Sequence, residues 1–141
     1  MLIAEIGVDM SYFPSDGHLA SWAALCPGNN ESAGKHRSGK TRGGNQWLRT
    51  ALVEAAWAAT RVEKSALAAR YRRVRHRGHQ KALIAVAHAI LRAAYHLLAE
   101  GTTYREPGAD YYDRRHADRV RRRAIQLLER QGYRVTLEPA A

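Results

Sequence analysis

The segment ALIAVAHAILRAAYHLLA, residues 82–99, has the clearest hydrophobic pattern in the chain. Its apolar residues recur at the three- and four-residue intervals of an α-helix. The face that they predict consists of Leu83, Val86, Ala87, Ile90, Ala94, Leu97 and Leu98. We therefore expect a helix over residues 79–99, ended by Gly101, to be the main core element. Because His88, Arg92 and His96 interrupt the segment, we do not expect it to span a membrane.

Helical patterns also lie on either side of this segment. Residues 1–6 have the pattern of a last helical turn that stops at Gly7. Residues 15–25 form the next candidate helix, with Ser15 as its N-terminal cap and Pro27 as the residue that ends it. Three further candidate helices cover residues 46–61, 65–76 and 114–131.

The candidate helix over residues 46–61 follows Asn45, a residue type that often caps a helix. Its apolar stripe consists of Leu48, Leu52, Ala55 and Ala59, widened by Trp47 and Ala51. Residues 133–137, YRVTL, alternate in polarity and predict a short C-terminal strand or an extended tail. Together these patterns predict a mainly α fold, a helical domain of about five helices.

Between two of these helices lies the segment CPGNNESAGKHRSGKTRGGN, residues 26–45. It holds five of the eleven glycines and has no apolar run that could be buried. Its positively charged side chains are those of Lys35, Arg37, Lys40 and Arg42, against the single acid Glu31. Loops of this length are usually functional or disordered, and glycine allows a backbone to approach a phosphate closely. We therefore expect a long, flexible, basic loop that contacts phosphate groups.

The whole chain shares this charge bias. Its 141 residues suffice for one domain with a modest core, and its formal net charge is +10. Such a charge favours a polyanionic partner, nucleic acid before membrane, although a basic protein without such a partner is the alternative. Two arginine-rich runs, residues 70–77 and 114–123, have tyrosines beside them and suit clamping of a nucleic-acid backbone. Two solvated helix faces are the alternative for these runs.

Metal-dependent phosphoryl transfer needs clustered carboxylates. The 13 acids are scattered, and the close pair Asp110 and Asp113 suits turn formation and helix capping. The seven histidines do not have the spacing of a metal site, and they fit a polar surface or phosphate contacts better. Cys26 is the single cysteine, which fits a reducing, cytoplasmic location. We expect no metal to be bound by this chain alone.

Ser32 lies in the basic loop beside the small residues Ala33 and Gly34. A serine hydroxyl can attack a phosphodiester and retain the cut strand as a phosphoserine, but it needs activation by a base, a metal or a cationic site. The neighbouring cations could neutralise charge that develops on the phosphoryl oxygens. A loop serine without any catalytic role is the alternative.

Three stretches resemble the C-terminal domain of transposases of the insertion sequence 110/116/902 family. The first is FPSDGHLASWAALCPGNNESAGKHRSGKTRGGNQWLRTALVEAAWAA, residues 13–59. The others are ALIAVAHAILRAAYHLLAEGTTYREPGADYYD, residues 82–113, and GYRVTLEP, residues 132–139. The resemblance covers nearly the whole chain, and its loop motif is specific.

This resemblance implies a role in DNA transposition. Family members join a RuvC-like nuclease domain with an acidic tetrad to this helical domain, and they use a serine of the helical domain as nucleophile together with metal held by the acidic domain. A structured bridge RNA guides donor and target DNA. By position the serine falls on Ser32, with Ala33 where glycine is common in the family, and Ser38 remains the alternative.

The acidic domain and a coiled-coil-like region of the family have no counterpart in the chain, so we expect an N-terminally truncated protein. Residues 1–25 would be the remnant of a helix-hairpin-helix-like segment and residues 26–141 the C-terminal helical domain. Such a fragment would bind nucleic acid by itself, but it would join DNA strands only together with a full-length transposase. Mg²⁺ is expected only with the missing acidic domain.

The resemblance also implies which residues bind DNA or RNA. They are Lys35, Arg37, Lys40, Arg42, Arg70, Arg72, Arg73, Arg75, Arg77, Arg121 and Arg122. The expected partners are DNA, a guide RNA and a full-length transposase in a homo-oligomer, with no membrane. A nucleic-acid-binding remnant or regulator without catalysis is the alternative function. A small basic ribosome- or nucleoid-associated protein is the third.

Overall fold

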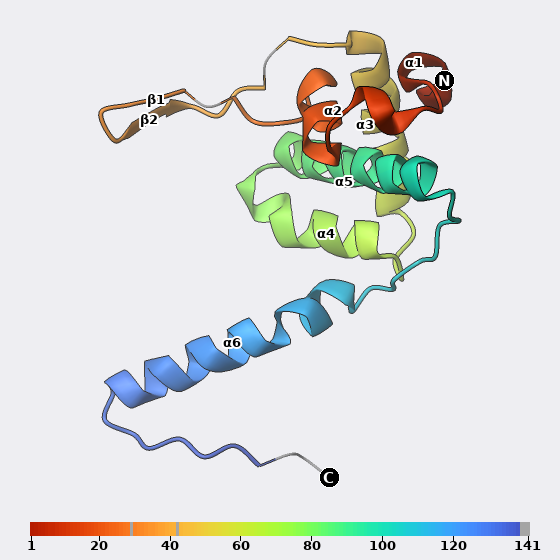
Figure 1. The fold of residues 1–141 in the computed structure, drawn as a ribbon. Helices are drawn as coiled ribbons and strands as arrows, with labels where there is room; N and C mark the ends of the chain where they lie inside the picture. The colour runs from red at the N-terminus through yellow and green to blue at the C-terminus, as the bar shows by residue number, and fades with distance from the viewer. Residues whose placement is uncertain (29, 42, 139–141) are drawn as a thin grey trace.

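The computed structural model describes residues 1–28, 30–41 and 43–138. Within these residues the chain is mainly helical, which confirms the predicted fold class (Figure 1). The helices are α1 (Leu2–Ile6), α2 (Asp16–Trp22), α3 (Gln46–Thr60), α4 (Ala66–Val74), α5 (His79–Glu100) and α6 (Tyr111–Arg130). The other described elements are the 3₁₀-helices η1 (Met10–Tyr12) and η2 (Arg75–Arg77) and the strands β1 (Asn30–Ser32) and β2 (Lys35–Ser38).

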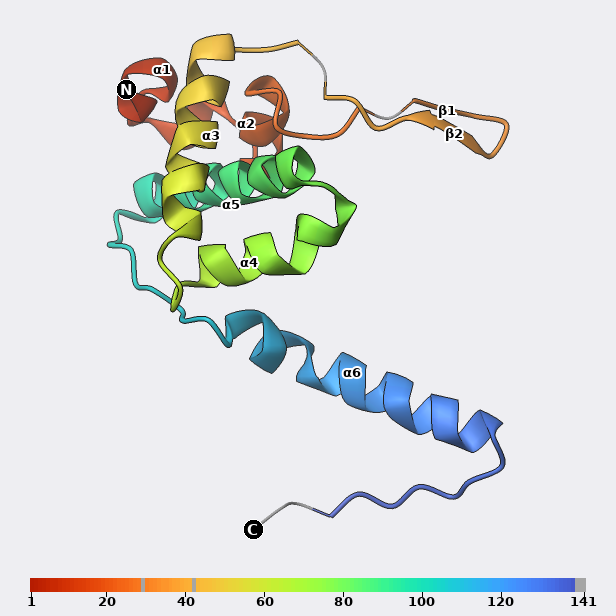
Figure 2. The same cartoon turned by 180° about the vertical axis from the view of Figure 1, so that it is seen from behind.

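Helix α5 is the centre of the helical body. Figures 1 and 2 show α2 and α4 on opposite sides of α5, with α3 crossing it. The core is one cluster that draws residues from α1, η1, α2, α3 and α5, and its largest fully buried side chains include Leu19, Leu48, Val86 and Leu91. Helices α1, η1, α2, α3 and α5 therefore share one core.

The buried face of α5 differs in one respect from the face that its periodicity predicts. Leu83, Val86 and Ala87 are buried as expected, but Leu91 is fully buried where Ile90 was expected, and Ile90 is half-buried. Beyond Leu91 the helix is covered less completely, and Tyr95 donates a hydrogen bond to the Phe13 carbonyl after η1 (3.0 Å). The last two turns, with Ala94, Leu97 and Leu98, are consequently only half-buried.

A similar shift occurs in α3. Ala56 is fully buried, whereas Ala55, which was expected in the apolar stripe, is exposed. Trp47 was also placed beside that stripe, but its side chain is 74% exposed. Spacing alone determines the buried face only to within about one residue, because the neighbouring helices decide which side is covered.

Among the described residues, α5 is the helix long and apolar enough to cross a membrane, by length and composition alone. The helix passes this test although His88, Arg92 and His96 interrupt its apolar residues. The structure gives these apolar residues another role, because they pack against α2, α3 and α4. The exposed side of the helix carries Arg92 and His96, which pair with Asp16 of α2.

The helix starts follow the predicted caps. The Ser15 hydroxyl accepts from the His18 N–H (3.4 Å), and the side-chain oxygen Oδ1 of Asn45 accepts from the Leu48 N–H (3.0 Å). The end of α2 was predicted wrongly, because the helix stops at Trp22 and not at Leu25 before Pro27. Ala24 adopts the left-handed conformation (φ 56°), and this ends the helix.

Helix α6 leaves the helical body and contacts only its α4 side among the described elements (Figure 1). The segment before it is anchored by Glu106, whose carboxylate accepts hydrogen bonds from the Ala66 N–H (2.8 Å), the Gly108 N–H (3.1 Å) and the Tyr104 hydroxyl (2.9 Å). Burial works to raise the pKa of Glu106, but these hydrogen bonds outweigh it and lower that pKa. Burial and the contact with Glu106 raise the pKa of Tyr104 to about 12.

The C-terminal region departs from the prediction at one point, because helix α6 begins at Tyr111, three residues earlier than expected. The described tail, residues 133–138, has no regular secondary structure, so of the two predicted alternatives the structure excludes the strand. Its first residue turns back on the helix, because the Tyr133 N–H donates to the Leu128 carbonyl (3.1 Å).

The link between α2 and α5 should make stability depend on pH. Partial burial works to raise the pKa of Asp16, but hydrogen bonds from Arg92 and His96 lower it below its ordinary value. A lowered carboxyl pKa stabilises the fold above the unfolded pKa, and this contribution is lost as the pH falls through the folded value. We expect Asp16→Asn to reduce the free energy of unfolding at pH 7 by about 1–2 kcal/mol. The reduction should shrink towards zero below about pH 3.

Urea denaturation at both pH values measures this difference. Asp118→Asn is the matched control, because the Asp118 carboxylate is 79% exposed and lies 3.5 Å from the Arg121 guanidinium. Its removal should change stability by less than about 0.5 kcal/mol. An Asp16→Asn effect of equal size at pH 7 and pH 3 would contradict the assigned role of the carboxylate.

Candidate nucleic-acid interface

Within residues 26–45, β1 and β2 form a β-hairpin, which corrects the expectation of a loop without regular structure. Strands β1 and β2 are antiparallel, with Ser32 opposite Lys35. Nearer the body, Pro27 forms a bridge with Thr41, and the Gly28 N–H donates to the Lys40 carbonyl (3.0 Å). We call the described part of residues 27–41 the hairpin arm. Figure 1 shows that it extends away from the helices, so its shape depends on its own backbone hydrogen bonds.

A two-residue turn closes the arm. Its central residues, Ala33 and Gly34, both have left-handed backbone angles (φ 50° and 72°). These are the signs of a type I′ turn, whose twist matches that of an antiparallel strand pair. Glycine adopts this conformation freely, whereas alanine pays about 1–2 kcal/mol. An Asn-Gly or Asp-Gly pair would have indicated the hairpin in the sequence, but Ala-Gly gave no such signal.

Ser32 is exposed at the end of the arm, directly before this turn. Lys35 is its cross-strand partner and is exposed as well. Side chains of directly opposite residues share one face of a hairpin, with Cβ atoms about 4.5–5.5 Å apart. The hydroxyl and the ammonium group can therefore reach the same phosphate.

The other residues of the arm that were expected to bind nucleic acid are placed less completely. Lys40 is exposed near the base of the arm. The side chains of Arg37 and Ser38, and the whole of Arg42, lie outside the described residues. Their assignments therefore stay predictions.

Gly44, in the segment that leads from the arm to α3, is packed closely against the end of α2. A Cβ atom on Gly44 would lie 2.7 Å from both the Trp22 carbonyl oxygen and the Ala24 Cβ. The next residue, Asn45, caps α3 and also donates its side-chain N–H to the Glu5 carboxylate of α1. This close approach fixes where the arm leaves the body.

We expect Gly44→Ala to lower the free energy of unfolding by about 1–3 kcal/mol, because the new methyl group meets backbone atoms that cannot rotate away. Gly43→Ala is the matched control, since a Cβ atom there has no neighbour within 4 Å. Thermal unfolding of both variants measures the difference. Equal melting temperatures would show that the contact between Gly44 and α2 is not tight in solution.

Several arginines of the first run have partners inside the protein. Arg70 donates from Nε to the Ala85 carbonyl of α5 (2.9 Å). The guanidinium groups of Arg70 and Arg73 lie over the Tyr112 ring, 5.8 and 5.9 Å from its centroid, and Arg73 pairs with Asp113 (2.8 Å). The contacts with Tyr112 and Asp113 attach α6 to α4. Arg72 is exposed and donates to the Glu63 carbonyl (3.1 Å).

Arg75 and Arg77 occupy a different position, in η2 at the far end of α4. Both are exposed. The Arg75 guanidinium lies over the Tyr71 ring (6.0 Å), and the Tyr71 hydroxyl shares a hydrogen bond with His79 Nδ1 (2.6 Å). Trp57 packs edge-on against the same histidine ring. The aromatic contacts hold Arg75 while its charge remains accessible to solvent.

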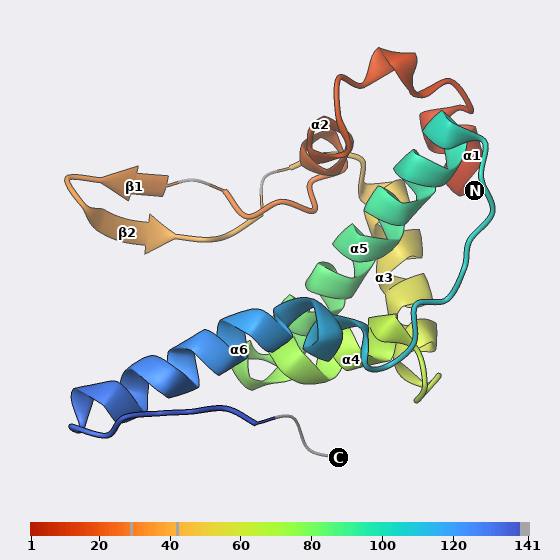
Figure 3. The same cartoon turned by 60° about the horizontal axis from the view of Figure 1, so that its bottom comes forward.

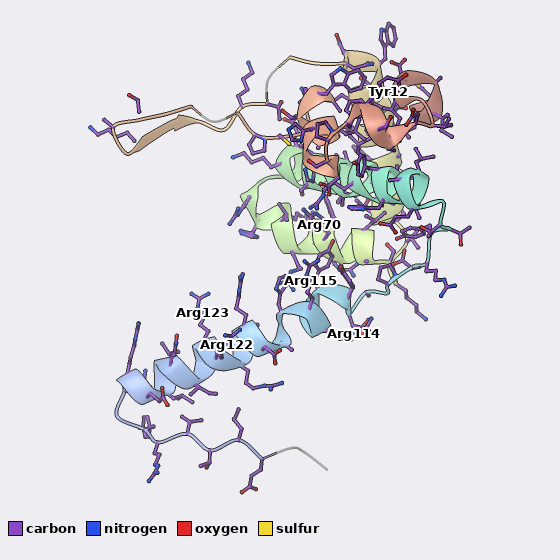
Figure 4. The ribbon with its side chains drawn as sticks, in the orientation of Figure 1. Tyr12, Arg70, Arg114, Arg115, Arg122 and Arg123 are labelled. Carbon is purple, nitrogen blue, oxygen red and sulfur yellow. The ribbon has the colours of Figure 1, made fainter. Side chains whose placement is uncertain are left out.

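On α6, Arg121 and Arg122 are exposed as expected. The Arg121 guanidinium lies 3.5 Å from the Asp118 carboxylate, and Arg122 donates to the Asp118 carbonyl (3.3 Å). Figure 4 shows Arg122 and Arg123 on the part of α6 beyond the helical body, whereas Arg115 lies beside α4. Arg123 is as exposed as its neighbours, and sequence reasoning omitted it although it belongs to the same run.

The arm and α6 project from the same side of the body. Figures 1–3, which view the chain from three directions, all show this arrangement, with η2 between the two projections. The structure therefore brings together three of the predicted basic segments, the arm, η2 and the outer part of α6, on one side. Trp47, at the start of α3, has an exposed aromatic ring that the sequence pattern had assigned to the core.

Among the described residues, no three His, Cys, Asp or Glu side chains come together as a metal site would require. These residues therefore do not fit the Mg²⁺ ion that the resemblance implies. His88 is half-buried, and burial, together with the charges of Arg92 and Arg70, lowers its pKa. It is thus neutral near pH 7, which does not favour a contact with phosphate.

Comparison with known proteins shows to which family the chain belongs. The sequence profile described as Transposase IS116/IS110/IS902 family matches residues 1–72, a span that includes the whole hairpin arm. The chain belongs to the IS116/IS110/IS902 transposase family. The resemblance to this family is thereby confirmed, whereas the C-terminal domain, the serine nucleophile and the truncation stay predictions.

A relative of this transposase-family chain is known in Streptomyces coelicolor (strain ATCC BAA-471 / A3(2) / M145). It is the insertion element IS110 uncharacterized 43.6 kDa protein, 33% identical over 107 residues. The alignment covers 74% of this chain and 26% of the relative. The chain thus spans about a quarter of the relative's length. No solved structure matches the chain.

Proposed function

We propose that this transposase-family chain binds DNA on the side from which the arm and α6 project, and that Ser32 is the nucleophile in strand joining. The observation that carries the proposal is the position of Ser32. Its hydroxyl is exposed at the end of a basic arm, on the same face as Lys35, in a family of transposases. The chain would act as the C-terminal domain of such an enzyme.

DNA binding is supported by charge and by exposure. The net charge is +10, and Lys35, Lys40, Arg75, Arg77, Arg121 and Arg122 are exposed in the three segments on this side. Lysine and arginine side chains bind the phosphate backbone with little dependence on sequence. A guide RNA presents the same phosphates, so it is proposed as a second partner of this surface. Arg70 and Arg73 are proposed to support the surface by attaching α6 to α4.

The proposed chemistry is a transesterification. The Ser32 oxygen attacks phosphorus, the bond from phosphorus to the sugar oxygen breaks, and the strand remains attached as a phosphoserine ester. The proton lost by the serine balances the proton taken up by the departing sugar oxygen. Lys35 is placed to neutralise charge on the non-bridging oxygens as it develops. Because one phosphate ester replaces another, a later attack by a sugar hydroxyl can reverse the step and join the strand elsewhere.

Activation of the hydroxyl is proposed to come from a second, full-length transposase chain. The described residues provide no carboxylate cluster, and no step is assigned to a metal on this chain. We therefore propose that the chain alone binds DNA but does not join strands, and that the arm carries Ser32 to the acidic domain of its partner.

The decisive experiment is to locate the attached nucleotide. The chain is mixed with a full-length family member whose own serine is replaced by alanine, and with a nicked DNA substrate that traps the covalent intermediate. Trypsin separates the two candidates, because the chain has no Lys or Arg before Lys35, whereas Ser38 falls in the peptide of residues 38–40. Mass spectrometry should find the nucleotide on Ser32. A nucleotide on another residue would refute the assignment.

The second candidate function is nucleic-acid binding without chemistry. The observation that favours it is again the lack of clustered carboxylates among the described residues. In the same mixture this function predicts tight DNA binding, weakened by added salt, with no covalent product on the chain. The same measurement thus separates a joining domain from a binding remnant or regulator.

A further inference from the structure

One face of α6 is apolar and uncovered. Ala117, Val120, Ala124 and Leu127 follow alternating three- and four-residue steps, the spacing of a coiled-coil seam. Leu128 widens this face, which we call the α6 stripe. The side chains of Val120 and Leu127 are 64% and 59% exposed, and no residue of α6 is buried. Helical propensity alone does not account for an apolar seam that runs away from the protein's own core.

The α6 stripe begins against the body and continues past it. Arg73 of α4 and Asp113, His116, Ala117, Val120 and Arg121 of α6 line a hollow of about 390 Å³ between the two helices. Beyond this hollow α6 extends past the described end of α4, with no other described element beside it (Figures 1 and 2). The described tail does not cover the stripe, since Leu127 and Leu137 both remain more than half exposed.

The borders of the stripe are basic. At 100° per residue, Arg121 falls on one border, and Arg123 and Arg130 fall on the other. These are the positions whose charges select the partner in a helix pair. The helix as a whole carries seven arginines against three acids. A second copy of α6 would bring these arginine rows together, and like charges at such positions oppose pairing.

DNA is also a poor occupant of this face, because a phosphate backbone offers nothing to cover Val120 and Leu127. We infer that the α6 stripe binds an acidic amphipathic helix of another protein chain, with apolar residues towards the stripe and Glu or Asp towards the arginine borders. Residues 117–128 provide a seam of about 18 Å. The occupant therefore has at least about three helical turns. This inference does not depend on the chemistry of Ser32.

Three synthetic helical peptides of four heptads test the inference on the full chain. The first has leucine at both seam positions and glutamate at the flanking positions. The second keeps the glutamates but has alanine at the seam, and the third keeps the leucines but has lysine at the flanks. We expect the first peptide to bind at least about tenfold more tightly than either of the others in isothermal titration calorimetry. Equal affinities for the first two peptides would show that charge alone accounts for binding, and this would overturn the inference.

Two variants place the contact on α6. Leu127→Asp should weaken binding of the first peptide at least about tenfold. Gln126→Asp is the matched control, because it adds the same charge on a face about 100° further from the stripe, and it should retain most of the affinity. Neither residue is in the core, so circular dichroism should show the same helix content for both variants. Equal weakening by both changes would overturn the assignment to the stripe.

Sedimentation of the full chain and a DNA competition complete the test. We expect a monomer at the concentrations used for calorimetry, because the arginine borders oppose self-pairing. A dimer that Leu127→Asp dissociates would show a second copy on the stripe and refute the inference. We also expect Leu127→Asp to weaken binding of the first peptide to the same extent with and without bound duplex DNA, because Arg121, which is proposed to contact both, is unchanged in that comparison. A Leu127→Asp effect that disappears when DNA is bound would show DNA on the stripe and refute the inference as well.

Discussion

Replacing Ser32 by alanine is expected to abolish the covalent protein–DNA adduct in a mixture with a full-length transposase, while leaving DNA affinity within about twofold. The adduct should fall by at least about a thousandfold, because the atom that forms the new ester is removed. Affinity should change little, since the lost hydroxyl is neutral and phosphate binding depends on the number of cations. Adduct formation on denaturing gels and DNA binding by fluorescence anisotropy measure the two quantities.

Ser38→Ala is the matched control, the same substitution on the opposite strand of the same arm. It should retain the adduct. The two variants separate a nucleophile from a general effect on the hairpin, because the described turn at Ala33 and Gly34 is present in both. An adduct that survives Ser32→Ala and disappears with Ser38→Ala would assign the chemistry to the other serine.

The largest effect on stability is expected from Leu91→Ala. Leu91 is fully buried in α5, within the cluster that joins α2, α3 and α5. Truncating a fully buried leucine costs about 2.7–5 kcal/mol, because apolar contacts are lost and a cavity remains. A single domain is stable by only about 5–15 kcal/mol, so the variant should melt roughly 10 °C lower.

Ile90→Ala is the control that separates the structure from the periodicity of the sequence. The sequence pattern places Ile90 in the core, whereas the structure leaves it half-buried beside Leu91. Urea denaturation should therefore show a clearly smaller loss for Ile90→Ala. A larger loss for Ile90→Ala than for Leu91→Ala would mean that α5 is rotated in solution relative to the structure described above.

The helices could be predicted because their signals are local. A cap at Ser15 or Asn45 and a glycine at Gly101 each act within about one turn, so the sequence shows them directly. The buried face of α5 could be predicted only approximately, since the choice between Ile90 and Leu91 depends on how α2, α3 and α4 surround the helix. The packing of distant segments is not contained in a local period.

The candidate site could likewise be predicted from the sequence only in part. Composition identified the basic segment, and the resemblance to a family identified its motif. The structure leaves Ser32 exposed, and its role stays a prediction. The hairpin was not predicted, because its strands are short and polar and the turn uses Ala33. Nor could the sequence separate arginines that attach α6, such as Arg70, from those that stay accessible, such as Arg77, because Ala85 and Tyr112 lie far along the chain.

The hairpin arm has a consequence for where a DNA strand would be cut. A strand advances about 3.3 Å per residue and alternates its faces, and the bases of one DNA strand are spaced about 3.4 Å apart. Lengthening both strands of the arm by two residues would keep the Ser32 hydroxyl on the same face and move it roughly two nucleotides further from the body. The length of the arm would then act as a ruler, which sets the distance between the DNA held by the arginines and the phosphate that is attacked.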